Sequence, residues 1–274
     1  MTKSRKIFSC SCHNIEERNS SNVDFEKCFN WFNNFAKSKN LHPTHLGISG
    51  KGFNGKIIPF DNGLKMLLEN KFNNLSTVNI YVSKSSSLDL AFYWDMLFSI
   101  SCSPILGTRL YLGIDSEIVK FSDLIVREIS KICCKLIDPI IGYFYLSSPE
   151  DGPFAYSFGA IHTPKNDYLT EDSKAVILEW SRNEDLVKEG KLRDLYQFNI
   201  LSHFQLNYEI DGDSLKNWVL TNKERGTFFE VSPNHILWEI PISNYHIIRN
   251  QLFLAKMLIS YDKYLMPTDL YKDY

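Results

Sequence analysis

A strand, an amphipathic helix and a second strand follow one another twice along this chain. The first set lies near residues 7–49 and the second near residues 108–146. A helix with one apolar face must cover a sheet, and a split βαβ connection lets each helix cover one sheet face. The repeated order therefore predicts an α+β fold of two split-βαβ (ferredoxin-like) halves, with helices packed on mainly antiparallel sheets.

The helix of the first set has the clearest pattern. Its apolar residues recur at i, i+3, i+4, i+7 and i+11, namely Phe25, Cys28, Phe29, Phe32 and Ala36. This spacing gives the helix one strongly aromatic face, and Asn22 or Asp24 is of the residue type that caps helix N-termini. We therefore expect a helix from about residue 24 to residues 39–40, with its phenylalanines in the core.

Shorter patterns predict the remaining elements. Glycines at positions 50, 52 and 55 indicate a turn between two strands, since glycine takes positive φ readily. Asp115-Ser116 is expected to cap the helix of the second set, and Pro139 to end it. We expect strands at 45–49, 56–60, 77–82, 109–114, 140–146, 154–161, 227–231 and 235–240, and helices at 61–72, 118–136, 180–190, 214–226 and 243–258.

The length allows one large domain or two modest ones. The chain has 274 residues, and domains commonly have ~100–200 residues. We place an N-terminal α+β half at residues 1–103 and a second half with a C-terminal elaboration at residues 104–259. Residues 260–274 are polar and rich in tyrosine, so we expect a loosely held tail.

Charge and hydropathy argue against two classes of partner. The chain has 30 Lys and Arg against 32 Asp and Glu, a net charge of −2, so it lacks the basic excess of most nucleic-acid binders. Its N-terminus lacks the apolar stretch of about 7–15 residues of a signal peptide, and no segment reaches the ~20 apolar residues that span a bilayer. We expect a soluble, cytoplasmic protein with neither a nucleic-acid nor a membrane partner.

The best metal candidate among the six cysteines is Cys10-x-Cys12-His13, with Cys28 downstream. A one-residue spacer in a strand places two thiols on the same face, whereas zinc sites prefer two to four residues between paired cysteines. Buried free thiols in a reducing cytosol are the better interpretation. We therefore expect no metal and no cofactor.

The sequence contains no recognised catalytic motif. The glycines at 50–52 lack the spacing of a phosphate-binding loop, and there is no Gly-x-Ser-x-Gly elbow. The pair Glu184-Asp185 is typical of a solvated helix face. His203 lies among apolar residues, which favours a packing role over catalysis. We therefore expect no catalytic residue.

A turn bounded by proline and glycine, residues 149–153, carries Glu150 and Asp151. Prolines lower the entropy that a turn loses on binding, so this turn can present two fixed carboxylates to a partner. Tyr156 and Phe154, a few residues on, would add the aromatic anchors that interfaces use. We predict that Glu150, Asp151 and Tyr156 bind a protein partner.

Several segments rich in Trp, Gly and aliphatic residues carry a family resemblance. They are PIIGY (139–143), GPFAYSFG (152–159), LRDLYQFNIL (192–201), LKNWV (215–219), RGT (225–227), LWEI (237–240) and IRNQL (248–252). In this half of its length the chain resembles bacterial polyimmunity proteins of the immunity protein 52 family. The resemblance implies an α+β protein that binds and neutralises a cognate toxin in the cytoplasm of the producing cell, without catalysis.

Two other functions stay open. One is an enzyme with a dispersed acid/His site, which a pocket lined by Asp or Glu with perturbed titration would favour. The other is a phage-encoded or host-directed protein that acts by binding. A neighbouring toxin gene would favour immunity, whereas a phage context or an adjacent secretion signal would favour the last function.

Overall fold

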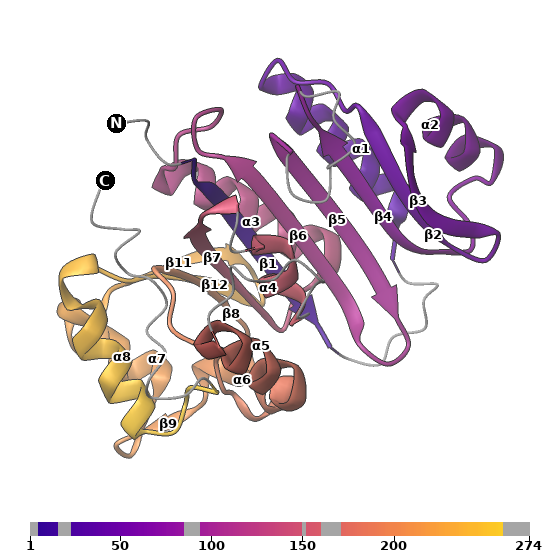
Figure 1. The fold of residues 1–274 in the computed structure, drawn as a ribbon. Coiled ribbons are helices and arrows are strands. Elements are labelled where there is room, and N and C mark those ends of the chain that lie inside the picture. Colours follow the sequence, from indigo (N-terminus) through magenta and orange to yellow (C-terminus); the bar gives the residue numbers. More distant parts are fainter. Residues whose placement is uncertain (1–4, 16–22, 85–93, 150–151, 160–170, 260–274) are drawn as a thin grey trace.

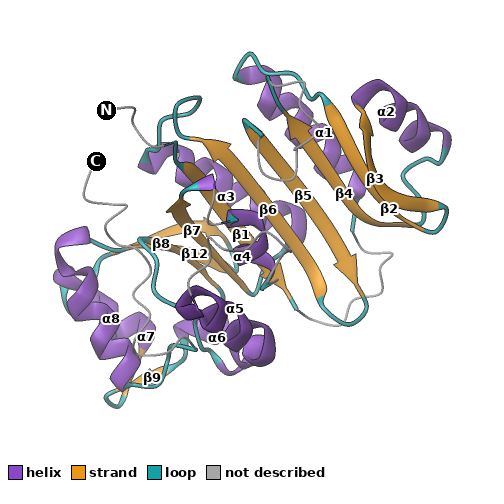
Figure 2. Cartoon of the chain, in the orientation of Figure 1, coloured by secondary structure: helices purple, strands orange, loops and turns teal. Residues whose placement is uncertain are grey.

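A computed structural model describes residues 5–15, 23–84, 94–149, 152–159 and 171–259 (Figure 1). Ten strands form one sheet in the order β11-β12-β8-β7-β1-β6-β5-β4-β2-β3, and β9 and β10 form a separate ribbon. All strand pairings in this described part of the chain are antiparallel. Helices lie on both sides of the sheet, so the predicted α+β class is confirmed (Figure 2).

The strands are β1 (Ile7–Asn14), β2 (His45–Gly50), β3 (Phe53–Pro59), β4 (Leu75–Val82), β5 (Met96–Ser103), β6 (Gly107–Asp115), β7 (Ile141–Ser147), β8 (Phe198–Leu201), β9 (Glu209–Ile210), β10 (Asp213–Ser214), β11 (Thr227–Ser232) and β12 (His235–Glu239). The helices are α1 (Phe25–Ser38), α2 (Phe60–Glu69), α3 (Asp123–Ile137), α4 (Pro153–Phe158), α5 (Glu171–Asn183), α6 (His203–Leu206), α7 (Leu215–Leu220) and α8 (Tyr245–Leu254). Short 3₁₀ helices are η3 (Glu184–Glu189), η4 (Lys223–Arg225) and η5 (Ile242–Asn244).

Strand β1 lies in the interior of the sheet, between β6 and β7. Ile7 is opposite Asp115 on one side and Ser147 on the other, and both pairings are antiparallel. Strands β6 and β7 therefore run parallel to each other, and α3 connects them in a split βαβ unit around β1. Strands β3 and β4, connected by α2, form a second split unit around β2.

The first predicted set differs from these units. Strands β1 and β2 also run parallel, but β6, β5 and β4 lie between them. All residues of β1 are buried, which requires neighbours on both edges and cover on both faces. The alternating pattern of a strand does not specify which neighbours it takes, and here both belong to the second predicted half. The division of the chain at residue 103 stays a prediction.

Helices α1, α2 and α3 cover one face of the sheet (Figure 1). Helix α1 begins where the sequence predicts, because the Asp24 carboxylate accepts a hydrogen bond from the backbone N–H of Lys27 at 2.8 Å. Phe29 and Phe32 are buried, and the Phe32 ring stacks on that of Phe98 in β5 with 5.1 Å between centroids. The aromatic face predicted from the spacing therefore lies in the core.

Helix α3 begins later than predicted. Its cap is Ser122, whose side chain accepts from the N–H of Ile125. The predicted cap, Asp115, ends β6 instead, because its carboxylate accepts hydrogen bonds from the Arg5 side chain and from the N–H of Glu117. These bonds hold residues 115–117 in a turn rather than in the first turn of a helix.

The strand predicted at 154–161 is wrong, because residues 153–158 form helix α4. Gly152 takes a left-handed φ of 59° just before the helix. Pro153 occupies the first helical turn, where its fixed φ is compatible with a helix and its missing N–H costs nothing. A proline and a glycine, read from the sequence as turn residues, therefore start a helix.

The second face of the sheet is covered unevenly. Helix α4 packs on aromatic residues of the central strands, among them Tyr111, Tyr143 and Tyr145. Helices α7 and α8 belong to a separate apolar cluster, with Trp238 of β12. In the ranges that the structure describes, no helix has both the length and the apolar character needed to cross a bilayer.

Candidate functional site

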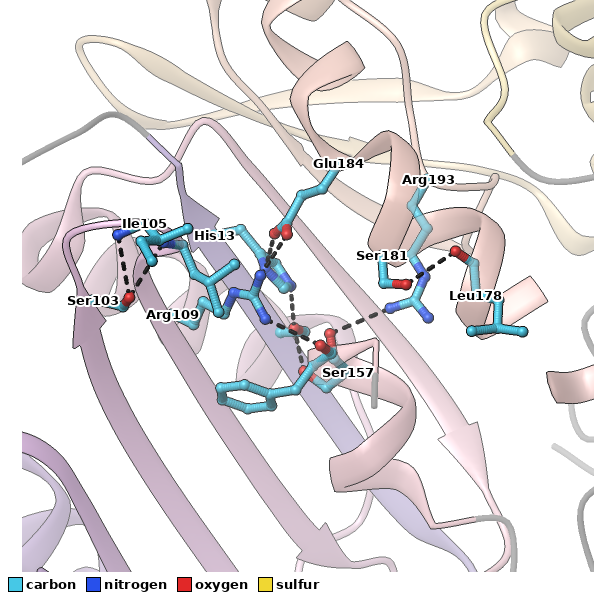
Figure 3. A network of polar contacts seen from close by, with 12 residues as sticks. His13, Ser103, Ile105, Arg109, Ser157, Leu178, Ser181, Glu184 and Arg193 are labelled. Atoms are coloured by element: carbon cyan, nitrogen blue, oxygen red, sulfur yellow. Dashed lines mark hydrogen bonds and ion pairs between the residues drawn. The ribbon is translucent and has the colours of Figure 1, made fainter. Parts of the chain in front are cut away.

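The polar residues of β1 point to the face that α4 and η3 cover. Ser9, Ser11 and His13 alternate with apolar residues along the strand, and all three are fully buried. Burying a polar side chain costs free energy unless it is hydrogen-bonded. Figure 3 shows the partners converging on His13 from strands and helices far apart in the sequence. We call this set the His13 cluster: Ser11, His13, Arg109, Tyr143, Ser157, Glu184 and Arg193.

His13 and Arg109 meet at the carboxylate of Glu184, the first residue of η3. Nδ1 of His13 lies 3.2 Å from Oε1 of Glu184, and the Arg109 guanidinium donates to Oε2. Arg109 also donates to the backbone carbonyl oxygen of Phe158 at 3.0 Å. The positive charge of Arg109 on β6 is thereby neutralised by Glu184 of η3, and the bond to Phe158 connects β6 to α4. These contacts explain how the second layer is held on the sheet.

The environment shifts the pKa of both titratable partners. Burial lowers the pKa of His13, and the charges of Arg109 and Arg193 add to this, against the opposing effect of Glu184. Burial acts to raise the pKa of Glu184, but its contact with His13 and the two arginine charges outweigh burial and lower that pKa. At neutral pH the cluster therefore holds a neutral imidazole and an ionised carboxylate.

Arg193 is the second cation of the His13 cluster and is 1% exposed. It donates to the Tyr143 hydroxyl and, at 2.7 Å, to the backbone carbonyl oxygen of Tyr156. The guanidinium carbon lies 3.8 Å from the Tyr156 ring centroid and 5.1 Å from that of Trp180. Cation–π contacts and neutral acceptors thus stabilise this buried charge.

Ser11, His13 and Glu184 lie in the order of a catalytic triad. Oγ of Ser11 is 2.7 Å from Nε2 of His13, whose other nitrogen faces Glu184. A nucleophile must also reach a substrate. Ser11 is 0% exposed, and its Oγ contacts Oγ of Ser157 on α4. The described residues enclose the serine, and the arrangement fits a structural hydrogen-bond chain between the sheet and α4.

An open groove of about 640 Å³ adjoins the His13 cluster. Strands β4 and β5 contribute small polar residues to it, and Arg109, Phe154 and Phe158 form its wall. Oδ1 of Asn79 and Oγ of Ser99 are buried in this lining and have no hydrogen-bond partner within the described chain. The lining residues are Ser76, Thr77, Asn79, Ser99, Ser101, Cys102, Ser103, Pro104, Leu106, Gly107, Arg109, Phe154, Ala155 and Phe158. A concave surface with aromatic walls and a few polar groups is a feature of a binding site.

The opposite face of β1 carries three buried thiols. Cys10 and Cys12 point toward α3, as their one-residue spacing predicts, and meet Cys133 of that helix. His13 points to the other face, so it cannot join them. Burial raises the pKa of Cys10 and of Cys12, while hydrogen bonds from these two thiols lower the pKa of Cys133. In the described part of the chain, this thiol cluster is the group of side chains that could hold a metal ion.

The structure describes only one of the three predicted partner-binding residues, Tyr156. Glu150 and Asp151 lie outside the described residues. Tyr156 is half-buried on α4, and its hydroxyl lies 2.8 Å from that of Tyr196, while its ring faces Arg193. Burial raises the pKa of Tyr156 to about 12. The role of all three in binding a partner stays a prediction.

Two expectations about polar residues are wrong. Glu184 is buried rather than on a solvated helix face, because η3 turns it toward His13 and Arg109. His203 is exposed rather than packed, and it lines a second pocket of about 270 Å³ together with His235. Both ring nitrogens of His235 are engaged, one with Ser232 Oγ and one with a backbone carbonyl oxygen.

Sequence reasoning missed Arg109, Arg193 and Cys133. Arg109 interrupts an apolar strand, and such a charge in a strand predicted to be buried is a signal for an internal partner. Arg193 has a similar signal, because it stands beside Asp194 in a segment of large apolar residues. No pattern in the sequence pairs Cys133 with residues more than a hundred positions away.

Comparisons with known proteins show a similar fold but no family. No family model matches the chain, and no curated protein matches it. The resemblance to the immunity protein 52 family is therefore not confirmed. Among solved structures, the fold is similar to that of a Pseudomonas aeruginosa protein described as T6SS protein PA0821, with a TM-score of 0.56 and 10% sequence identity over 95% of this chain and 77% of that chain. At this identity the likeness shows a shared fold.

Proposed function

We propose that the chain is a bacterial immunity protein that neutralises a cognate toxin by forming a stoichiometric complex with it. The observation that carries the proposal is the likeness of the fold, over 95% of the chain, to a protein described as belonging to T6SS, the type VI secretion system. The resemblance of several sequence segments to polyimmunity proteins supports the same function. An inhibitor of this kind needs a binding surface and no catalytic residues.

The chemistry of the described residues supports binding over catalysis. Ser11, His13 and Glu184, which lie in the order of a catalytic triad, are buried, whereas the groove beside them is open and has a polar lining. An enzyme with an acid/His site is the alternative. Hydrolytic activity that disappears in Ser11→Ala, while the fold persists, would favour that alternative.

We place the toxin-binding face at the groove and at the acidic turn that precedes α4. Phe154 and Phe158 on α4 form the aromatic wall of the groove. Glu150 and Asp151 stand just before Gly152 and α4 in the sequence, which supports including them in the proposed face. Polar groups of a toxin would pair with the hydroxyls of Thr77 and Ser101, which line the groove and are half-buried.

Co-expression with a candidate toxin from an adjacent gene tests the function. We expect growth to be rescued and the two proteins to elute together from a size-exclusion column in a fixed ratio. The same toxin expressed with an unrelated protein is the control. No rescue of growth and no complex on the column would contradict the proposed function.

Substitution of Ser101, a half-buried residue of the groove, tests the position of the face. Ser101→Arg places a long, charged side chain in the groove and should weaken toxin binding by at least about tenfold, because central interface positions dominate affinity. Thr227→Arg, on the exposed edge strand β11, is the matched control and should bind normally. Equal affinities of the two variants would show that the groove is not the binding face.

Charge reversal tests the acidic turn. Replacing Glu150 and Asp151 with Lys should slow association and weaken the complex, because charges at an interface steer encounter. The melting temperature should change little, since a turn of this kind contributes little to the core. Glu69→Lys combined with Glu128→Lys reverses two exposed charges elsewhere and controls for net charge. Unchanged affinity in the turn variant would mean that the turn is only structural.

A further inference from the structure

The thiol cluster on β1 and α3 has the dimensions of a metal site. Sγ of Cys10 lies 3.8 Å from Sγ of Cys12 and 4.0 Å from Sγ of Cys133, and all three sulfur atoms lie within 4.8 Å of one another. An ion at the centre of a triangle with edges of 3.8, 4.0 and at most 4.8 Å lies about 2.3–2.5 Å from each sulfur, and metal–thiolate bonds are about 2.3 Å long. The ligands therefore need little rearrangement to bind an ion.

We propose that Cys10, Cys12 and Cys133 bind one Cu(I) ion with three sulfur ligands. Thiolates select soft ions such as Cu(I) and zinc over hard ones. Structural zinc sites take four ligands, and among the described residues no His, Asp or Glu joins the three sulfurs. Cys28 and Cys134 are buried nearby but fall outside the group. A soft ion that three sulfur ligands suffice to bind matches this donor set best.

The surroundings of the thiol cluster favour an ion that needs no water ligand. All three cysteines are 0% exposed and belong to the large apolar core between the sheet and helices α1 and α3. Such a site supplies sulfur ligands and no water. Each cysteine binds as a thiolate after its proton has left to solvent, and copper remains Cu(I) throughout, so no electron is transferred.

The elements that carry the thiols are fixed on every side. Strand β1 is paired along its length with β6 and β7, and α3 connects these same two strands. Ligands on such rigid elements are more precisely placed than ligands on loops. Because the site is enclosed, an ion must enter during folding or through a transient opening of α3. This proposal does not depend on the proposed immunity function.

Titration of the reduced full-length protein with Cu(I), without oxygen and against the chelator bathocuproine disulfonate, tests the proposal. Loading is done both on the folded protein and during refolding, so that slow entry does not hide the site. We expect one equivalent per chain, three sulfur ligands at about 2.3 Å by X-ray absorption, and a higher melting temperature, because an ion bound to the folded state stabilises it.

Single substitutions separate this site from general thiol chemistry. Cys12→Ala and Cys133→Ala should each weaken binding by at least about 100-fold, since losing even an outer-shell partner costs 10–100-fold in metal affinity. Cys102→Ala removes a buried thiol of β5 outside the group and should leave binding unchanged. Circular dichroism establishes that each variant is folded, and either of the two ligand variants suffices if the other does not fold.

Three results would overturn the proposal. Binding of one equivalent with unchanged affinity in a folded ligand variant would show that other groups hold the ion. Binding of several equivalents together with loss of the folded signal would show capture by an unfolded chain. A site that prefers zinc, with a fourth ligand in the X-ray absorption spectrum, would show that the choice of Cu(I) is wrong.

Discussion

Glu184 and Asp185 are adjacent acidic residues with opposite environments. Glu184 is buried against Arg109 and His13, whereas Asp185 is exposed. Glu184→Gln should lower the free energy of unfolding by about 3–5 kcal/mol, because it leaves the buried guanidinium without its counter-charge. Asp185→Asn is the matched control and should change stability by no more than about 0.5 kcal/mol. Urea unfolding measures both, and equal effects would show that the buried pair does not hold η3.

The pKa shifts of His13 and Glu184 make the protein less stable in acid. The pKa of His13 is lowered in the folded protein. Below the ordinary histidine pKa of about 6.5 the unfolded chain therefore binds more protons than the folded one, and the free energy of unfolding decreases as the pH is lowered. The lowered pKa of Glu184 adds a further loss as pH falls below 4.5. We expect the melting temperature to fall between about pH 7.5 and pH 5. His13→Gln, which does not titrate, should fall less steeply, and identical profiles would contradict this assignment.

At the scale of single elements, α1 shows how a pattern becomes core packing. The Phe29 ring stacks on that of Phe60 at 6.0 Å and lies 5.5 Å from that of Phe72, so it joins α1 to α2 and the turn after it. Phe29→Ala should cost about 3–5 kcal/mol of unfolding free energy, as large-to-small changes in a core do. Asn30→Ala, exposed on the same helix, should cost little. A fully stable Phe29→Ala variant would contradict this packing.

Local signals predicted most elements on the first face of the sheet. The aromatic spacing and the Asp24 cap were enough to predict helix α1. The glycines that take positive φ between and beside the strands were enough to predict the hairpin of β2 and β3. These elements were predictable because their signals lie within a few residues of one another. Helix α4 was not, since Gly152 and Pro153 occur in turns as well as at helix starts.

The His13 cluster could not be assembled from the sequence. The spacing of Cys10 and Cys12 predicted that their thiols share a face, and Ser11 and His13 must then lie on the opposite one. Which face is covered, and by what, depends on how η3 and α3 return to β1 from more than a hundred residues away. Such long-range contacts are decided by the packing of whole layers, not by local propensity.

For the whole molecule, β1 matters more than its length implies. It comes from the N-terminal end of the chain, yet it completes the sheet between β6 and β7. Phe8 of β1 stacks on Phe144 at 5.6 Å and meets Phe121 edge-on at 4.8 Å. One continuous apolar cluster contains these residues together with α1 and β5. The predicted halves at residues 1–103 and 104–259 therefore share a core as well as a sheet.

This shared core makes a prediction about unfolding. Phe8→Ala should destabilise the protein by about 3–5 kcal/mol, and the loss should appear equally at Trp31, before residue 103, and at Trp238, far beyond it. Labelling with 5-fluorotryptophan lets fluorine NMR follow each of the five tryptophans during urea unfolding, with assignments from single Trp→Phe variants. We expect the midpoints of Trp31 and Trp238 to coincide in the wild type and to shift together in Phe8→Ala. The reason is that β6 and β7 each lose one neighbouring strand when β1 detaches. A midpoint that moves for Trp238 while that of Trp31 stays would show that the two halves unfold independently.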